Sequence, residues 1–354
     1  EGLKVPAGGD EAFICNVKTF TPYPTVEDAP VTTYFLENQE YYEKRDNIYG
    51  YTDDSVRWAL LSRGVLEFIR AHKDWRPDVI VASDWQAGLI PNYLHTEYKD
   101  DPVLKNIPVV FSIHNLFYQG MFNHRFVSEM DYDSGQGALP SLKDPKLLKI
   151  NFMRRGIMYA DIINTVSDNY SKEIMTPEYG ELLDDLLRER RSRLYGILNG
   201  VDYVSRDPEA DPLVEHKFNV NSIDERAKNK AFLQDKLGLP VNNDVFLMGI
   251  VSRLTEQKGL DLLIDSADAL LRNFNVQLVA VGTGDSRYMD FFRSLQERYP
   301  KNVVAHLNYE ETMAHYIFAG ADAVLIPSKF EPCGLVQMEA MRYGAIPIVR
   351  KTGG

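Results

Sequence analysis

Two positively charged side chains follow one predicted strand in the second half of the chain. Arg253 and Lys258 lie in the segment SRLTEQKG, at the end of the apolar run 245–252. A guanidinium and an ammonium beside Gly259, where a helix is predicted to start, have the chemistry to hold a diphosphate. The alternative is that both side chains belong to an exposed basic loop of an acidic protein.

A second candidate anion site lies in the segment SKFEPCGLVQMEAMRYG, residues 328–344. Gly334 permits a close backbone approach, and the predicted helix that begins at Leu335 presents free N–H groups. A phosphate would repel Glu331, so we expect this carboxylate to face a neutral or cationic part of the ligand. By its residue type alone, Cys333 is a small buried apolar residue.

Polar residues also follow two predicted strands of the first half. Asp84 comes directly after the run 78–83, and His114 and Asn115 come directly after 108–113. The carboxylate can orient sugar hydroxyls or stabilise a developing positive charge, or it can cap the following helix. A lone histidine at a strand end is more often structural than catalytic. The seven histidines contain no HxxxH or HxH pair, so we predict no metal site.

Together these residues suit the departure of a nucleoside diphosphate from a sugar. Arg253 and Lys258 would neutralise the leaving group, as a divalent metal does in other enzymes. Asp84 and the two residues after the next strand would lie across a cleft from these cations. We therefore expect a nucleotide-sugar site that needs no metal.

Alternating strands and helices must position these residues. β-Branched apolar runs indicate buried parallel strands; they are 78–83, 108–113, 161–166, 245–252, 276–282, 303–307, 323–328 and 346–350. Helical patterns lie between them, and residues 1–50 are hard to assign. The alternation predicts an α/β fold of doubly wound sheets, with ligands beyond the carboxyl ends of the strands.

The pattern breaks near residues 202–217, which contain RDPEADP and form a candidate linker. With 354 residues, this break predicts two domains, 1–205 and 206–354. The chain opens on Glu1 rather than Met and stops at Gly354, directly after a predicted strand. We therefore expect an internal fragment in which both domains are incomplete.

Composition restricts the partners. The net charge of −12 argues against nucleic acid, because nonspecific binding to phosphate backbones requires clustered Lys and Arg. No apolar run of about 18 residues is long enough to span a membrane. Cys15 and Cys333 are far apart in the sequence, which favours reduced thiols in a cytoplasm over a disulfide framework.

The chain resembles the bacterial glycogen synthase and plant starch synthase family, which are retaining glucosyltransferases with the GT-B fold of two Rossmann-like domains. The resemblance covers essentially the whole chain, in family order, and rests on DWQAGLIPNYL, FSIHNLFYQGMF, INFMRRGIMYADIINTVSDNYSKEI, GILNGVD, VSRLTEQKGLDLL, GTGD, SKFEPCGL and RYGAIPIVRKTGG. EPCGL together with SRLTEQKGLDLL is far more specific than any single motif.

The resemblance implies transfer of glucose from ADP-glucose, or from UDP-glucose in some members, to the 4-hydroxyl at the nonreducing end of an α-1,4-glucan. The reaction would retain configuration and use neither metal nor cofactor. The partners would be the nucleotide sugar and the glucan. Residues 1–205 would form the acceptor side, and residues 206–354 would bind the nucleotide sugar.

The resemblance also implies roles for individual residues. The catalytic residues would be Asp84, His114, Arg253, Lys258 and Glu331. The nucleotide- and phosphate-binding residues would be Arg253, Lys258, Tyr309, Gly334, Leu335, Glu339 and Thr352. The sugar-binding residues would be Asn115, Asn199 and Cys333. Tyr309 would stack on the nucleotide base, and Thr352 would belong to a loop beside the donor.

Some positions depart from the family pattern. Gln86 replaces a histidine, and Val336 replaces a threonine. Glu339 replaces a frequent tyrosine and completes a pair with Glu331, seven residues lying between them, as in other retaining GT-B enzymes whose second glutamate holds the ribose. The alternative is a surface glutamate. The family's Lys-x-Gly-Gly loop has no counterpart, so we expect little or no activity from this fragment alone.

Other functions remain open. One is a different retaining GT-B glycosyltransferase, which would share the two cations and the glutamate pair. Another is a noncatalytic glucan-binding protein with the same fold. The incomplete glycine motif GTGD, residues 282–285, disfavours a dehydrogenase.

Overall fold

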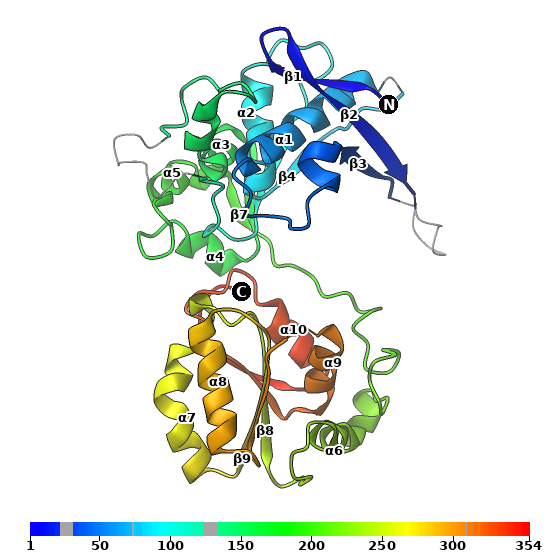
Figure 1. Cartoon of the computed structure of the whole chain (residues 1–354), viewed down its shortest axis with the longest axis vertical. Helices are drawn as coiled ribbons and strands as arrows, with labels where there is room; N and C mark the ends of the chain where they lie inside the picture. Colours follow the sequence, from blue (N-terminus) through cyan, green and yellow to red (C-terminus); the bar gives the residue numbers. More distant parts are fainter. Residues whose placement is uncertain (22–30, 73, 123–132, 309) are drawn as a thin grey trace. The chain divides into compact units, whose positions relative to one another are not determined.

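The computed structural model describes residues 1–21, 31–72, 74–122, 133–308 and 310–354 (Figure 1). The chain divides into two compact units, unit 1 (Glu1–Ile197) and unit 2 (Leu198–Gly354). The sequence predicts the boundary after residue 205, within a segment that packs on unit 2. Asp211 of that segment accepts a hydrogen bond of 2.5 Å from the Tyr343 hydroxyl.

Unit 2 is built on a parallel sheet whose order is β10-β9-β8-β11-β12. Its strands are β8 (Phe246–Val251), β9 (Val276–Val281), β10 (Val303–His306), β11 (Ala323–Ile326) and β12 (Ile346–Val349). Each strand lies within a predicted apolar run. The strand order reverses at β8, which confirms a doubly wound sheet.

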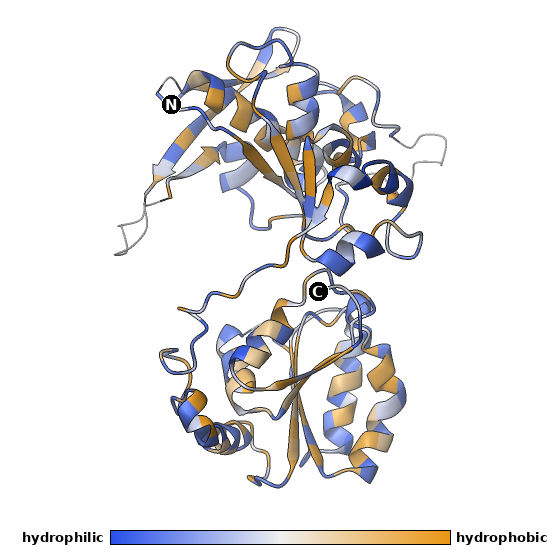
Figure 2. Cartoon of the chain, turned by 180° about the vertical axis from the view of Figure 1, so that it is seen from behind, coloured by the Kyte–Doolittle hydropathy of each residue, from blue (hydrophilic) through white to orange (hydrophobic). Residues whose placement is uncertain are grey.

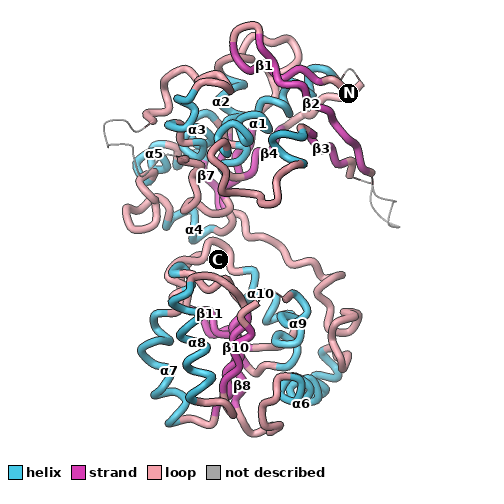
Figure 3. Tube along the Cα trace, in the orientation of Figure 1, coloured by secondary structure: helices cyan, strands magenta, loops and turns pink. Residues whose placement is uncertain are grey.

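Helices cover both faces of this sheet. They are α6 (Arg226–Lys236), α7 (Asp261–Asn273), α8 (Ser286–Arg298), α9 (Glu311–Gly320) and α10 (Leu335–Arg342), with short 3₁₀ helices η6 (Val220–Glu225) and η7 (Glu256–Lys258). Figures 1 and 3 show α7 and α8 on one side of the strands and α6, α9 and α10 on the other.

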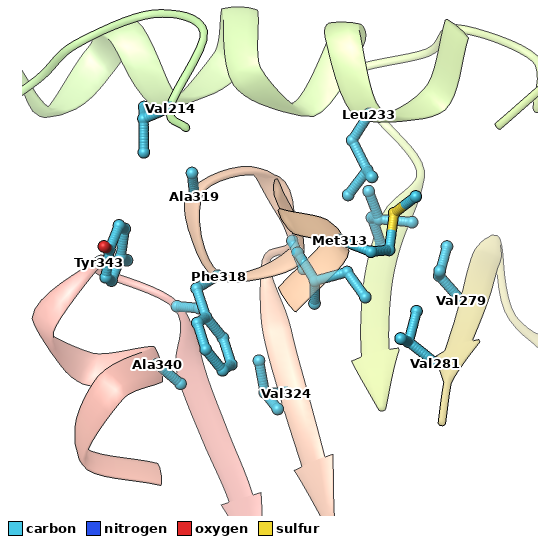
Figure 4. Packing of buried hydrophobic residues seen from close by; sticks show 14 of the residues in the cluster. Val214, Leu233, Val279, Val281, Met313, Phe318, Ala319, Val324, Ala340 and Tyr343 are labelled. Carbon is cyan, nitrogen blue, oxygen red and sulfur yellow. The ribbon is translucent and has the colours of Figure 1, made fainter. Parts of the chain in front are cut away.

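The strands of unit 2 bury both of their faces. All six residues of β9 are buried, and its apolar residues divide between two cores. Leu278 and Ala280 pack with α7 and α8, whereas Val279 and Val281 pack beneath α9 (Figure 4). Figure 2 accordingly shows mostly hydrophobic strands between helices of mixed polarity. This two-sided burial explains why the strands are continuous apolar runs in the sequence.

Unit 1 contains a second parallel sheet and a smaller antiparallel one. The parallel sheet has the order β4-β5-β6-β7. Its strands are β4 (Ile80–Ser83), β5 (Val109–Ile113), β6 (Ile162–Thr165) and β7 (Leu194–Gly196). The first three strands lie within predicted runs. The sequence analysis missed β7, which is only three residues long.

The antiparallel sheet accounts for part of the N-terminal stretch that the sequence left unassigned. It consists of β1 (Leu3–Gly8), β2 (Glu11–Phe20) and β3 (Thr33–Glu37), with β2 in the middle. Its β1 strand contacts α1 and buries Val5 and Ala7. Burial in this sheet is partial, and Ile14, Phe20 and Phe35 are exposed, so its strands show neither a buried apolar run nor a regular alternation.

The helical elements of unit 1 surround these sheets. They are the π-helix η1 (Gln39–Glu43), α1 (Asp54–Ala71), η2 (Trp85–Ala87), α2 (Leu89–His95), η4 (Pro145–Lys149), α3 (Phe152–Tyr159), α4 (Asp168–Glu173), α5 (Asp184–Glu189) and η5 (Arg191–Arg193). Among them, η2 and α2 follow β4 directly, so Asp84 lies at the junction of strand and helix.

A buried lysine ties α6 to the sheet of unit 2. Lys230 is only 6% exposed, and its Nζ donates to Asn243 O at 3.0 Å and to Val245 O at 2.6 Å. The same ammonium lies 2.7 Å from Asp322 Oδ2, which also accepts from Leu247 N. One cation therefore satisfies several groups at the amino ends of β8 and β11.

We predict that Lys230→Met destabilises the protein by roughly 3 kcal/mol, because it removes one partner of a buried ion pair and leaves two carbonyls unsatisfied. Urea unfolding measures this change. Lys228→Met is the matched control, since Lys228 is exposed on the same helix and pairs with Glu225; it should change stability by less than about 0.5 kcal/mol. Equal free energies of unfolding for the two variants would contradict a stabilising role for the Lys230 contacts.

Candidate active site

The loop between β11 and α10 holds a carboxylate in a fixed position. Glu331 Oε2 lies 2.7 Å from Lys258 Nζ and accepts a hydrogen bond of 2.9 Å from Ser328 Oγ. Both members of the ion pair are largely buried. The structure thus joins Lys258 to Glu331, which the sequence analysis assigned to different parts of the ligand. It also adds Ser328, whose only sequence signal is its place at the end of a predicted strand.

The loop that follows β8 packs against this segment. Lys329 N donates to Gln257 O at 2.8 Å, and the Gln257 side chain donates to Phe330 O at 3.3 Å. Because β8 and β11 are neighbours in a parallel sheet, the loops at their carboxyl ends meet at one edge. Arg253 lies two residues beyond β8 and is exposed, whereas Lys258 points into the pair described above.

The N-terminus of α10 adjoins this pair. Gly334 precedes the helix in the left-handed conformation, with φ of 82°, which a glycine adopts readily. No side chain of the described residues caps the helix. The N–H groups of the first turn, beginning at Leu335, are therefore arranged as the sequence predicts for an anion site.

The Thr352 loop lies against the same segment. Gly353 has a φ of 63°, and a Cβ built on it would lie 1.5 Å from Glu331 O, so only glycine fits there. The Gln337 side chain of α10 donates to Gly354 O at 2.8 Å. Thr352 itself is half-buried beside these contacts.

Cys333 and Asn199 lie next to each other. Cys333 is 6% exposed, which agrees with a small buried residue. Burial raises the pKa of its thiol, and hydrogen bonds from the backbone and side chain of Asn199 act in the opposite direction. The structure therefore brings together two residues that the resemblance assigns to sugar binding.

Glu339 is not an isolated surface glutamate. Its Oε1 lies 3.1 Å from Arg206 Nε, and the Arg206 guanidinium also contacts His315 Nε2. Arginine can only donate, so Nε2 accepts, and the other ring nitrogen carries the hydrogen that bonds Asp211 Oδ2 at 2.5 Å. The sequence analysis missed Arg206, which lies in the segment expected to be a linker.

In unit 1, backbone N–H groups of the loop after β5 bind the Asp84 carboxylate. Asp84 Oδ1 accepts from His114 N at 2.8 Å and from Asn115 N at 3.4 Å. Its side chain makes no capping hydrogen bond to η2, which excludes the alternative of a helix cap. Burial raises the pKa of Asp84, and these backbone hydrogen bonds partly oppose the rise. Its φ of 54° is unusual for a residue other than glycine.

The residues after β5 complete this group. His114 is exposed, and its Nε2 lies 3.3 Å from Ser112 Oγ. Asn115 Oδ1 accepts from Phe117 N at 3.1 Å. Gln86, one of the departures from the family pattern, donates to the Tyr49 hydroxyl at 2.8 Å. Asp84, His114 and Asn115 thus gather at the carboxyl ends of β4 and β5.

Tyr309 lies outside the described residues. Within the part of the chain that the structure describes, no three His, Cys, Asp or Glu side chains are grouped so as to hold a metal ion. The described helices also include none with the length and apolar character needed to cross a membrane.

Comparison with known families matches both halves of the chain. The starch synthase catalytic domain family matches residues 5–189, and the family of glycosyl transferases group 1 matches residues 230–354. The glycogen synthase of Clostridium perfringens is 47% identical over 325 residues, which are 91% of this chain and 66% of that protein. The glycogen synthase of Thermotoga petrophila is 41% identical over 357 residues, covering 100% of this chain and 72% of that protein.

A solved structure agrees with these matches. The catalytic domain of starch synthase IV from Arabidopsis thaliana, bound to ADP and acarbose, superposes with a TM-score of 0.82 at 31% sequence identity. The superposition covers 99% of this chain and 71% of that one. The chain spans about two thirds of the length of the curated relatives. It belongs to the glycogen synthase and starch synthase family of glycosyltransferases, whose GT-B fold its two units share.

Proposed function

We propose that the protein transfers glucose from ADP-glucose to the 4-hydroxyl at the nonreducing end of an α-1,4-glucan, with retention of configuration. The observation that carries this proposal is the Lys258–Glu331 pair beside the open N-terminus of α10. The pair sets a cation and a carboxylate where a diphosphate and its sugar would meet. The glycogen synthase relatives supply the substrate class.

Unit 2 would bind the donor. Arg253, Lys258 and the N–H groups of Gly334 and Leu335 would hold the diphosphate and neutralise the charge that develops as it leaves. Because Lys258 already contacts Glu331, its ammonium would then bridge the phosphate and the carboxylate. Asn199, Cys333 and the Thr352 loop would contact the glucose.

The nucleoside would lie near Glu339 of α10. Arg206 holds one carboxylate oxygen of Glu339, so the other would accept hydrogen bonds from the ribose hydroxyls. Tyr309 would stack on the base. ADP in the starch synthase IV structure supports an adenine nucleotide.

Unit 1 would supply the acceptor side and the remaining catalytic groups. Asp84, held by the His114 backbone, would stabilise positive charge on the sugar carbon, while His114 and Asn115 would contact the sugar. Retention would follow either from attack on the same face as the departing phosphate or from a covalent intermediate. The two buried free cysteines suit a reducing cytoplasm.

Replacing Glu331 with Gln should lower kcat about a hundredfold, because the neutral amide no longer stabilises positive charge or anchors Lys258. The KM for the donor should change much less. Steady-state kinetics of the protein expressed from its complete gene measure both constants. Glu256→Gln is the control, since Glu256 is exposed in the neighbouring loop. Normal turnover of the Glu331 variant would disprove this role.

Incorporation of labelled glucose into glycogen tests the donor. We expect transfer from ADP-glucose to be at least about tenfold faster than from UDP-glucose, a difference of about 1.4 kcal/mol in transition-state binding. Faster transfer from UDP-glucose would overturn the choice of nucleotide. No transfer from either donor would overturn glucan synthesis and favour a noncatalytic binding protein.

The acid limb of the pH profile should report Asp84. Catalysis requires its carboxylate, and burial raises the folded-state pKa above the usual value of about 4. Activity should therefore be full above this raised pKa and fall as the pH drops through it. Asp84→Asn should lower kcat about a hundredfold and remove this limb. Asp78→Asn, an exposed neighbour ahead of β4, should keep the profile; a limb that persists in Asp84→Asn would assign it to another group.

A further inference from the structure

Unit 1 contains a small cavity of mixed polar and apolar lining that has no role in the mechanism above. Its volume is about 230 Å³, below that of pockets for drug-sized ligands. It is lined by Gln119, Met121, Asn151, Arg154, Glu181, Leu182 and Leu183. These residues come from the loop after β5, the start of α3 and the segment before α5, so the cavity suits one compact ring rather than a nucleotide.

Two opposite charges line this cavity without pairing. Arg154 Nε is buried and has no hydrogen-bond partner among the described residues, and neither Arg154 nor Glu181 forms an ion pair with any of them. Burial raises the pKa of Glu181. The neighbouring Arg155, by contrast, donates to both carboxylate oxygens of Asp133, at 2.9 and 2.8 Å. Both side chains are half-buried, and the buried Arg154 Nε is a donor that a ligand could satisfy.

A chain of hydrogen bonds fixes the walls. Gln119 Nε2 donates to Glu181 O at 2.8 Å, and Asn151 Nδ2 donates to Gln119 Oε1 at 2.7 Å. Glu181 and Leu182 both have positive φ, 48° and 64°, which non-glycine residues rarely adopt. Leu182 is 75% exposed, so burial of its side chain does not explain this conformation. Such strained backbone is typical of binding and catalytic sites.

The charges restrict the chemistry of the ligand. An anion would be repelled by Glu181, and a cation would be repelled by Arg154. A neutral ligand with adjacent hydroxyls can donate to the carboxylate and accept from the guanidinium at the same time. A sugar ring has this pattern of hydroxyls, and the buried amides of Gln119 and Asn151 add further polar groups.

We propose that Gln119, Asn151, Arg154 and Glu181 form a subsite for a glucosyl unit of the α-glucan acceptor. This inference rests on the proposed function. The same loop after β5 carries His114 at its start and Gln119 five residues further on, and Met153 N of α3 donates to Gln119 O at 3.0 Å. A sugar bound in the cavity would therefore contact the same loop that carries His114.

The test uses Glu181→Gln and Arg154→Met in the protein expressed from its complete gene. Each variant removes one charge, and Glu181→Gln also keeps the size of the side chain. We expect the KM for maltotetraose as acceptor to rise about tenfold in each, while the KM for the nucleotide sugar stays unchanged. Calorimetric titration with maltotetraose, without donor, should show a similar loss of affinity. Glu178→Gln is the matched control, because Glu178 is an exposed carboxylate of the same segment that does not line the cavity.

Two results would overturn the subsite. One is unchanged acceptor KM and maltotetraose affinity in both variants, with unfolding temperatures equal to that of the unmodified protein. The other is binding of inorganic phosphate that Arg154→Met abolishes while maltotetraose binding persists, which would indicate an anion site. If Arg154→Met fails to fold, Glu181→Gln decides alone. If the unmodified protein transfers no glucose, the proposed function fails, but the titration still tests the subsite.

Discussion

Burial of the parallel strands on both faces is the constraint on which the rest of the structure depends. All six residues of β9 are buried, and its apolar side chains divide between two cores, while Gln277 hydrogen-bonds the Gln234 side chain and Pro240 O. The interior of the sheet is therefore mainly apolar, and the residues that can meet a ligand lie where the strands end. In unit 2, Lys258 and Glu331 lie in the loops after the neighbouring strands β8 and β11, and in unit 1 Asp84 directly follows β4.

The charged side chains of the molecule differ in how their charges are stabilised. Glu331 and Lys258 satisfy each other at 2.7 Å, and Asp84 is satisfied by backbone N–H groups rather than by a cation. The carboxylates of Glu331 and Asp84 are therefore stabilised differently, by a lysine ammonium in one case and by backbone N–H groups in the other. Arg154 and Glu181 differ from both, because their charges line a cavity without a partner among the described residues.

Much of the fold could be predicted because parallel strands and amphipathic helices have strong periodic signals. The five strands of unit 2 and β4, β5 and β6 of unit 1 fall within the predicted runs. The antiparallel sheet could not be predicted, since apolar residues such as Ile14 and Phe35 occupy exposed positions and its strands lack a regular alternation. The contacts of Arg206 with Glu339 and His315 join residues more than 100 positions apart, and no local pattern carries that information.

The sequence by itself determined the α/β class, the strand ends that bear polar residues and, through EPCGL and SRLTEQKGLDLL, the family. These features are local, because they depend on residue type, periodicity and spacing along the chain. Only the tertiary structure decided which of these residues meet: Lys258 with Glu331, Cys333 with Asn199, and Asp84 with the backbone after β5. The physical reason is that strand order in a doubly wound sheet, rather than distance in the sequence, selects the loops that become neighbours.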